Sequence, residues 1–141
     1  MPDATNLRLL DRLEQIADQL IAQLDADACA ISRVIGEVLI LVAERIPGGG
    51  TLQQGEGFLV PDYPMTADVL RTREPFALTL DDPDVDEAEA SVLRQHGFGS
   101  LVMLPLELDG GVWGLVEVYR VDRRAFTSTE VDLAVHLSRV R

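Results

Sequence analysis

The chain has 141 residues, of which 47% are hydrophobic, and it carries a formal net charge of −12 and a single cysteine. No stretch approaches the roughly 18 uninterrupted apolar residues of a membrane-spanning helix, and one cysteine cannot form an internal disulfide bond. Nucleic acid and anionic membrane surfaces are disfavoured as partners, because binding a polyanion depends on clusters of basic residues. No secretory leader is visible, so we expect one cytoplasmic domain.

The N-terminal third of the chain predicts a helix followed by a β-hairpin. Residues 28–35 and 37–46 are rich in β-forming residues, and Gly36 between them indicates the hairpin turn. The glycines of residues 47–57 predict a loop. The preceding helix, residues 6–24, has apolar residues at alternating steps of three and four, as in a heptad seam: Leu10, Leu13, Ala17, Leu20 and Leu24.

The middle of the chain predicts two short helices on either side of a strand. Thr66 is a candidate N-cap for a helix that ends near Thr72. Residues 75–80 have the composition of a strand. The acidic loop that begins at Asp81 continues into a helix that ends at Gly97, and its acidic residues stand at the helix start, where the helix dipole favours anions.

A second hairpin is predicted for residues 99–108 and 112–120. A three-residue turn gives each strand one uniformly aliphatic face, whereas a two-residue turn would mix the two faces. The opposite face is mixed, because it combines apolar side chains with Glu117 and Tyr119. The register predicted from the three-residue turn pairs Leu108 with Val112, Leu104 with Val116, and Val102 with Val118.

The last predicted element is a helix over residues 126–141, in which Thr127 and Glu130 have the spacing of a capping box. Two hairpins joined by short helical segments indicate an antiparallel sheet in an α+β fold. We expect the two terminal helices to cover the aliphatic face of this sheet. Residues 47–97 remain to cover the mixed face.

Three stretches resemble a GAF domain: "DYPMTADVLRTREPFAL" (62–78), "LRQHGFGSLVMLPLELDGGVWGLVEVYR" (93–120) and "AFTSTEVDLAVHLSRV" (125–140). The resemblance covers nearly the whole chain. It implies a single domain, residues 1–141, with a central antiparallel sheet of five to six strands. It also implies that the helices at 6–24 and 126–141 lie on one face and dimerise, and that short helices and loops within 28–120 cover a small-molecule pocket on the other. The leucines expected at the dimer contact are Leu10, Leu13, Leu20, Leu24 and Leu137.

GAF domains bind cyclic nucleotides, haem, linear tetrapyrroles or small metabolites, so the resemblance does not identify a ligand. The cyclic-nucleotide pattern of the family, Asn-Lys followed by Phe-x-x-x-Asp-Glu, is matched only in part. Phe126 is kept, and Arg120 with Glu130 preserves the pair of opposite charges, but Tyr119 and Val131 depart from the pattern. We interpret Arg120 and Glu130 as a structural ion pair.

Other ligand chemistries depend on single residues. Tetrapyrrole-binding members attach the bilin through a cysteine near the pocket, whereas Cys29 begins the first strand and is interpreted as a small buried residue. His96 is the candidate haem ligand, because it is the histidine expected on the pocket side. The acidic residues of 81–87 lack EF-hand spacing, so no metal site is predicted. The sequence requires no cofactor and contains no recognisable catalytic constellation, and we expect a protein that is not an enzyme.

The candidate pocket is placed on the mixed face of the second hairpin. Apolar walls with a few polar groups suit a small ligand, and Glu117 favours one with a donor or a positive charge. The alternative is that Glu117 only hydrogen-bonds the cover of this face, since a buried carboxylate needs a partner with or without a ligand. The residues expected to line the pocket are Tyr63, Thr79, Leu101, Met103, Glu117 and Tyr119.

The sequence therefore predicts a regulatory module of signal transduction. In this hypothesis a small cytosolic molecule binds in the pocket and shifts the arrangement of the terminal helices, which relay the change through a homodimer to an effector domain. Two alternatives remain open. One is a GAF domain that serves only for dimerisation, and the other is a haem or redox sensor that acts through His96.

Overall fold

The computed structural model describes residues 4–49 and 57–140. A seven-stranded sheet has the order β3-β2-β1-β6-β5-β4, with β7 beside β5. Its strands are β1 (Ala28–Ile35), β2 (Val38–Arg45), β3 (Gly57–Leu59), β4 (Phe76–Thr79), β5 (Ser100–Leu108), β6 (Gly111–Arg120) and β7 (Arg139–Val140). The helices are α1 (Ala4–Leu24), α2 (Pro64–Thr72), α3 (Glu87–His96), α4 (Ser128–Leu137) and the short 3-10 helix η1 (Val60–Asp62). The predicted α+β class is confirmed, and the strands beyond five are the very short β3 and β7.

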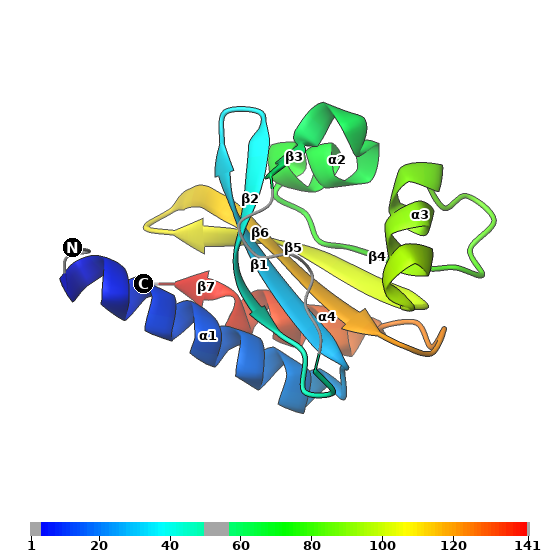
Figure 1. Ribbon diagram of the computed structural model, residues 1–141, viewed down its shortest axis with the longest axis horizontal. Helices are drawn as coiled ribbons and strands as arrows, with labels where there is room; N and C mark the ends of the chain where they lie inside the picture. Colours follow the sequence, from blue (N-terminus) through cyan, green and yellow to red (C-terminus); the bar gives the residue numbers. More distant parts are fainter. Residues whose placement is uncertain (1–3, 50–56, 141) are drawn as a thin grey trace.

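Each face of the sheet is covered by its own pair of helices (Figure 1). Helices α1 and α4 lie on one face, and α2 and α3 lie on the other. The α1/α4 core joins the aliphatic face of the second hairpin to α1 through Val102, Leu104, Val116, Val118, Leu13 and Leu20. The α2/α3 core joins the mixed face to the short helices through Leu101, Met103, Leu115, Tyr119, Val69 and Leu93. The division into two faces agrees with the one predicted from the alternation of side chains.

The predicted three-residue turn of the second hairpin is wrong. Strand β5 ends at Leu108 and β6 begins at Gly111, so that Asp109 and Gly110 form a two-residue turn. Their φ angles of 52° and 83° are both positive, as a type I′ turn requires. Leu108 therefore pairs with Gly111 and not with the predicted Val112. Beyond a β-bulge next to Leu106 the predicted register is confirmed, since Leu104 pairs with Val116 and Val102 with Val118.

The bulge also changes the face of the sheet on which Trp113 lies, compared with the face that strand alternation predicts. In an uninterrupted strand Trp113 would share the mixed face with Glu117. The structure instead packs it at the margin of the α1/α4 core, with the guanidinium of Arg33 at 5.5 Å from the centre of its ring. Trp113 is therefore not part of the mixed face.

The C-terminal helix is shorter than predicted. Helix α4 begins with the predicted capping box, in which Thr127 and Glu130 bond each other's backbone N–H. It ends at Leu137 instead of continuing to residue 141, and the chain then forms β7, which pairs in parallel with the end of β5. Val140 is thereby buried in the α1/α4 core. This burial favours the strand over another turn of helix.

The leucines of the predicted heptad seam lie mostly inside the chain. Leu13, Leu20 and Leu24 are fully buried in the α1/α4 core, because the seam faces the sheet. Leu137 is partly buried against the same core, and Leu10 is 39% exposed. A dimer contact on α1 stays a prediction, and it would have to use residues other than the three buried leucines.

The short helices on the other face are fixed by local signals at their ends. Helix α2 begins at Pro64, and Tyr63 is its N-cap residue without a side-chain hydrogen bond, so the expected capping by Thr66 is wrong. Helix α3 is capped by the Asp86 carboxylate. It ends at His96, and the Gly97 that follows has a φ of 76°, which confirms the predicted helix end. Among residues 4–49 and 57–140, no helix is both long enough and apolar enough to cross a bilayer.

Candidate ligand-binding site

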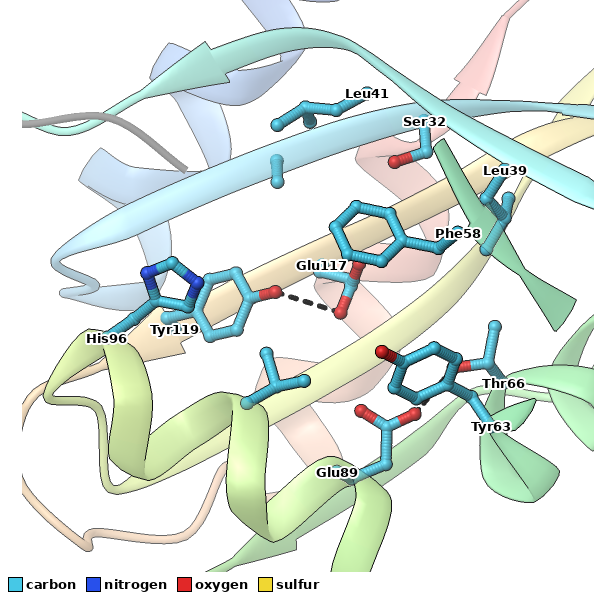
Figure 2. A pocket seen from close by; sticks show the side chains of 12 residues that line it. Ser32, Leu39, Leu41, Phe58, Tyr63, Thr66, Glu89, His96, Glu117 and Tyr119 are labelled. Atoms are coloured by element: carbon cyan, nitrogen blue, oxygen red, sulfur yellow. Dashed lines mark hydrogen bonds between the residues drawn. The ribbon is translucent and has the colours of Figure 1, made fainter. Parts of the chain in front are cut away.

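A cavity lies between the sheet and the cover formed by β3, α2 and α3 (Figure 2). It has a volume of about 60 Å³, measured as the space open to the centres of water molecules. Since one water needs roughly 10–15 Å³ on this measure, the cavity has room for several waters or one small ligand. It is lined by Ala30, Ser32, Leu39, Leu41, Phe58, Tyr63, Thr66, Glu89, Val92, His96, Glu117 and Tyr119.

Strand β6 supplies the polar pair at the floor of the cavity. Glu117 and Tyr119 are two residues apart and therefore point to the same face of the sheet. The Tyr119 hydroxyl donates a hydrogen bond of 2.8 Å to Glu117 Oε2. The Tyr119 ring stacks on Phe98, with ring centres 4.7 Å apart. The phenol is thus held in place from behind while its hydroxyl orients the carboxylate.

Burial changes the acid–base properties of this pair. It raises the pKa of Glu117 to about 8, the negative charge of Glu89 adds to the rise, and the hydrogen bond from Tyr119 opposes it. The pKa of Tyr119 is also raised, first by burial and then by the charge of Glu117. At neutral pH the Glu117 carboxyl of the ligand-free protein therefore holds a proton.

The cover contributes a second buried carboxylate, Glu89 of α3, which is only 2% exposed. The Thr66 hydroxyl of α2 donates a hydrogen bond of 2.6 Å to Glu89 Oε1 and lies 3.4 Å from the sulfur of Met103. Burial raises the pKa of Glu89, while the bond from Thr66 opposes the rise and the nearby Asp86 adds to it. The bond between Thr66 and Glu89 ties the two covering helices together.

Three of the six predicted lining residues reach the cavity: Tyr63, Glu117 and Tyr119. Leu101 and Met103 do not, since β5 lies under α2 and α3 and both side chains are packed in the α2/α3 core. Thr79 does not either, because its backbone N–H and hydroxyl both bond the Asp82 carboxylate in the turn after β4. The cavity lies over β1, β2 and β6, and the prediction had centred it on β5 and β6.

The lining residues missed from the sequence come from the first hairpin and the cover. The alternation of β1 and β2 gives one face with Ala30, Ser32, Leu39 and Leu41, but the sequence does not say which strand lies beside β6. The inward position of Glu89 could have been predicted from the sequence. It precedes the buried Ala90 and Leu93 by one and four positions on α3, so helical periodicity places it on the inner side.

Residues 8–140 match the family model of the GAF domain. The chain belongs to the GAF domain family. Comparison with curated proteins gives no match.

Solved GAF domains have the same fold. The blue-light-absorbing PixJ GAF domain of Thermosynechococcus elongatus superposes with a TM-score of 0.81 at 17% identity, over 99% of this chain and 86% of that one. The GAF domain of a two-component sensor histidine kinase from Bacillus halodurans gives 0.70 at 17%, over 89% and 88%. The chromophore-binding domain of a Stigmatella aurantiaca bacteriophytochrome gives 0.71 at 18%, over 89% and 50%. At these identities the similarity shows the fold.

The large cofactors found in GAF domains do not fit this cavity. Cys29, the single cysteine of the chain, is fully buried in the α1/α4 core on the opposite face of the sheet, where burial raises the pKa of its thiol. It is not placed to attach a bilin. His96 does line the cavity, but about 60 Å³ leaves no room for a haem. Within residues 4–49 and 57–140, no three His, Cys, Asp or Glu side chains gather as metal ligands.

The end of β6 joins this GAF domain's cavity to its terminal helices. Arg120 follows Tyr119 and points to the opposite face, where it is 1% exposed. Its guanidinium forms an ion pair of 2.6 Å with Glu130 and lies 4.0 Å from the centre of the Phe126 ring. It also donates hydrogen bonds to the backbone carbonyls of Leu24, Asp25, Arg124 and Ala125. The ion pair expected from the sequence is thus present, and Arg120 connects the end of α1 with the start of α4.

Proposed function

We propose that this chain is a non-catalytic sensory GAF module that binds a small cytosolic molecule in the cavity beside Glu117. The observation that carries the proposal is the Glu117–Tyr119 pair, which lines the cavity and whose printed hydrogen bond stays within β6. A carboxylate that only held the cover would have its partner there, whereas Glu117 bonds a neighbour on its own strand. A polar pair with open space in front of it is what a small ligand needs.

The proposed output of this module is a change in the terminal helices. Tyr119 faces the cavity, and the next residue, Arg120, holds the carbonyl of Leu24 at the end of α1 and the carboxylate of Glu130 in α4. A ligand that displaces β6 by a fraction of an ångström would alter these bonds. We propose that α1 and α4 pass such a change through a homodimer contact to an effector domain.

The two alternatives have weaker support. A haem sensor acting through His96 would need the cavity to open widely. A module used only for dimerisation would have no use for two carboxylates in a cavity, since burying them lowers stability and an apolar filling would not. The sensory function is therefore the one that the geometry favours.

The proposal is tested by a thermal-shift screen of small metabolites against the wild-type chain. A ligand at about 100 times its Kd should add roughly 2.7 kcal/mol to the free energy of unfolding. The variants Glu117→Gln and Tyr119→Phe should reduce the shift, and Asp84→Asn, in the exposed acidic loop, should leave it unchanged. If both cavity variants respond like the wild type to every stabilising compound, the assignment of the cavity as the binding site is wrong.

A further inference from the structure

The two carboxylates of the cavity come from opposite walls. Glu117 belongs to β6 in the floor, and Glu89 belongs to α3 in the cover. Figure 2 shows both side chains beside the same space, with the rings of Phe58 and Tyr63 near them. The charge of Glu89 acts on Glu117, and the charge of Asp86 acts in turn on Glu89. The site is thus a cavity with two acidic walls, distinct from the exposed acidic loop at 81–84.

No arginine lines this cavity among the described residues. Arginines of the described chain form their ion pairs elsewhere, as Arg45 does with Glu14 and Arg123 with Asp81, and the sequence contains no lysine. The titratable groups that face Glu117 are Tyr119 on its own strand, Glu89 and His96 on α3, and Tyr63 before α2, while β1 and β2 contribute Ala30, Ser32, Leu39 and Leu41. The lining therefore offers neither Glu117 nor Glu89 an arginine or lysine as a partner.

We propose that the cavity binds a small organic cation through an ammonium or guanidinium group, which contacts the Glu117 carboxylate and is balanced by Glu89. This inference rests on the proposed function and specifies its ligand class. A cation forms charge-assisted hydrogen bonds to a carboxylate that are about twice as strong as neutral ones. The rings of Phe58 and Tyr63, whose centres lie 6.2 Å apart, offer aromatic surface to the same cation.

The size and chemistry of the walls separate this ligand from others. A volume of about 60 Å³ corresponds to roughly five non-hydrogen atoms if each takes the space of a water. A bare divalent cation prefers about six oxygen ligands, and it would gain nothing from the aliphatic and aromatic side chains that make up much of the lining. An anion would be repelled by Glu89 when it is ionised and would gain no ion pair from the protonated Glu117. A small organic cation satisfies the charge and the apolar surface together.

Binding of the cation replaces the proton that Glu117 holds in the empty cavity. The Glu117 carboxyl, with a pKa of about 8, holds a proton in the empty cavity at neutral pH. An arriving guanidinium ion needs the ionised carboxylate, so the proton leaves to solvent as the cation enters. The affinity should therefore rise about tenfold per pH unit below pH 8 and level off above it.

The test is an NMR titration of the ¹⁵N-labelled chain with three probes of nearly equal size. Methylguanidinium is the cation, methylurea is its neutral isostere, and propionate is the anion. We expect methylguanidinium to shift the amide signals of Phe58, Thr66 and Glu117, with an affinity at least about tenfold higher than that of the other two probes. Between about pH 6 and pH 9 its affinity should increase by up to roughly 100-fold.

Matched variants test whether the Glu117 carboxylate is the group that binds the cation. Glu117→Gln keeps the shape of the side chain and removes the charge, and it should weaken methylguanidinium by about tenfold or more and abolish the pH dependence. Asp84→Asn removes one charge from the exposed loop and should change neither. The ¹H–¹⁵N spectrum of each variant reports whether it remains folded.

The contrary outcomes distinguish the inference from the proposed function. If methylurea or propionate shifts the amide signals of the cavity as strongly as methylguanidinium, the proposed cationic ligand class is wrong, while the assignment of the cavity as the binding site is kept. If methylguanidinium acts only on residues 81–84 and Asp84→Asn removes the effect, the ligand class is again wrong. If no probe and no compound of the thermal-shift screen binds in the cavity, the proposed function is contradicted as well.

Discussion

The Glu117 carboxyl is a costly group to bury in the ligand-free protein. A buried carboxyl that must hold a proton at neutral pH is a less favourable core residue than a leucine of similar size. The hydrogen bond from Tyr119 reduces the cost but does not remove it, since the pKa of Glu117 is still raised to about 8. Such a residue fits a site that is completed by a ligand.

The first prediction concerns the pH dependence of stability. The pKa of Glu117 is higher in the folded chain than in the unfolded one, so its contribution to stability is complete below pH 4.5 and is lost as the pH rises through about 8. Glu117→Gln has no such dependence. The variant should match the wild type near pH 5 and exceed it by about 1–3 kcal/mol near pH 9, as measured by urea unfolding. A difference that stays constant with pH, or that Asp84→Asn reproduces, contradicts the raised pKa.

The second prediction concerns Gly114, where β6 passes close to β1. A Cβ atom built there would overlap the carbonyl oxygen of Ser32, which is rigid backbone. Gly114→Ala should therefore lower the free energy of unfolding by about 2–4 kcal/mol. Gly111→Ala, in the same strand, meets nothing closer than 3.8 Å and should cost about 0.5 kcal/mol or less. Equal effects of the two substitutions would show that the close approach is absent.

Single residues could be predicted where strand alternation alone decides their direction. Glu117 and Tyr119 were identified this way, because one face of β6 is apolar except for them. Thr66 was interpreted only as a helix cap, and Glu89 was not assigned to the cavity although helical periodicity places it on the inner side of α3. Leu101 and Met103 were assigned to the cavity wrongly. The face of the sheet on which they lie was predicted correctly, but the position of the covering helices over β5 depends on the tertiary structure.

Among the elements, the second hairpin shows how two local errors cancel. The alternation of side chains requires a certain register at the centre of the hairpin, and a three-residue turn is the simplest way to obtain it. The two-residue Asp109–Gly110 turn with a bulge near Leu106 gives the same central register. The pattern therefore determines which residues share a face, and it does not determine the length of the turn.

The third prediction concerns the link between β6 and the terminal helices. Lysine cannot reproduce the fork of hydrogen bonds that Arg120 makes to the carbonyls of Leu24 and Ala125 and to Glu130. Arg120→Lys should therefore cost about 2–4 kcal/mol in the free energy of unfolding. Amide hydrogen exchange should quicken at the end of α1 and the start of α4 before it does in β5.

The neighbouring Arg124 provides the matched control. It pairs with Asp25 at 3.0 Å but is more than half exposed, so Arg124→Lys should leave both the free energy of unfolding and hydrogen exchange essentially unchanged. If Arg120→Lys behaves like Arg124→Lys, Arg120 does not couple the cavity strand to the helices.

The whole molecule has two cores separated by one sheet. The sequence predicted this division, and it predicted that residues 47–97 cover the face opposite the terminal helices. It did not predict the place of the cavity, because the strand order puts β1 beside β6 with β2 beyond β1, and leaves β4 and β5 under α2 and α3. Strand β6 touches both cores, with Tyr119 in one and Val118 in the other. Strands β1 and β2 also lie between the cavity and α1, and β6 adds the bonds of Arg120 to Leu24 at the end of α1 and to Glu130 in α4.

The most direct test of this account is a crystallographic fragment screen of the wild-type chain and of Ala30→Leu, which fills the cavity from β1 without removing a polar group. We predict electron density for bound fragments between Glu117 and Glu89 in wild-type crystals, and none there in Ala30→Leu crystals. Fragments that bind only outside the cavity, or that bind equally in both crystals, would contradict the assignment of this cavity as the ligand site.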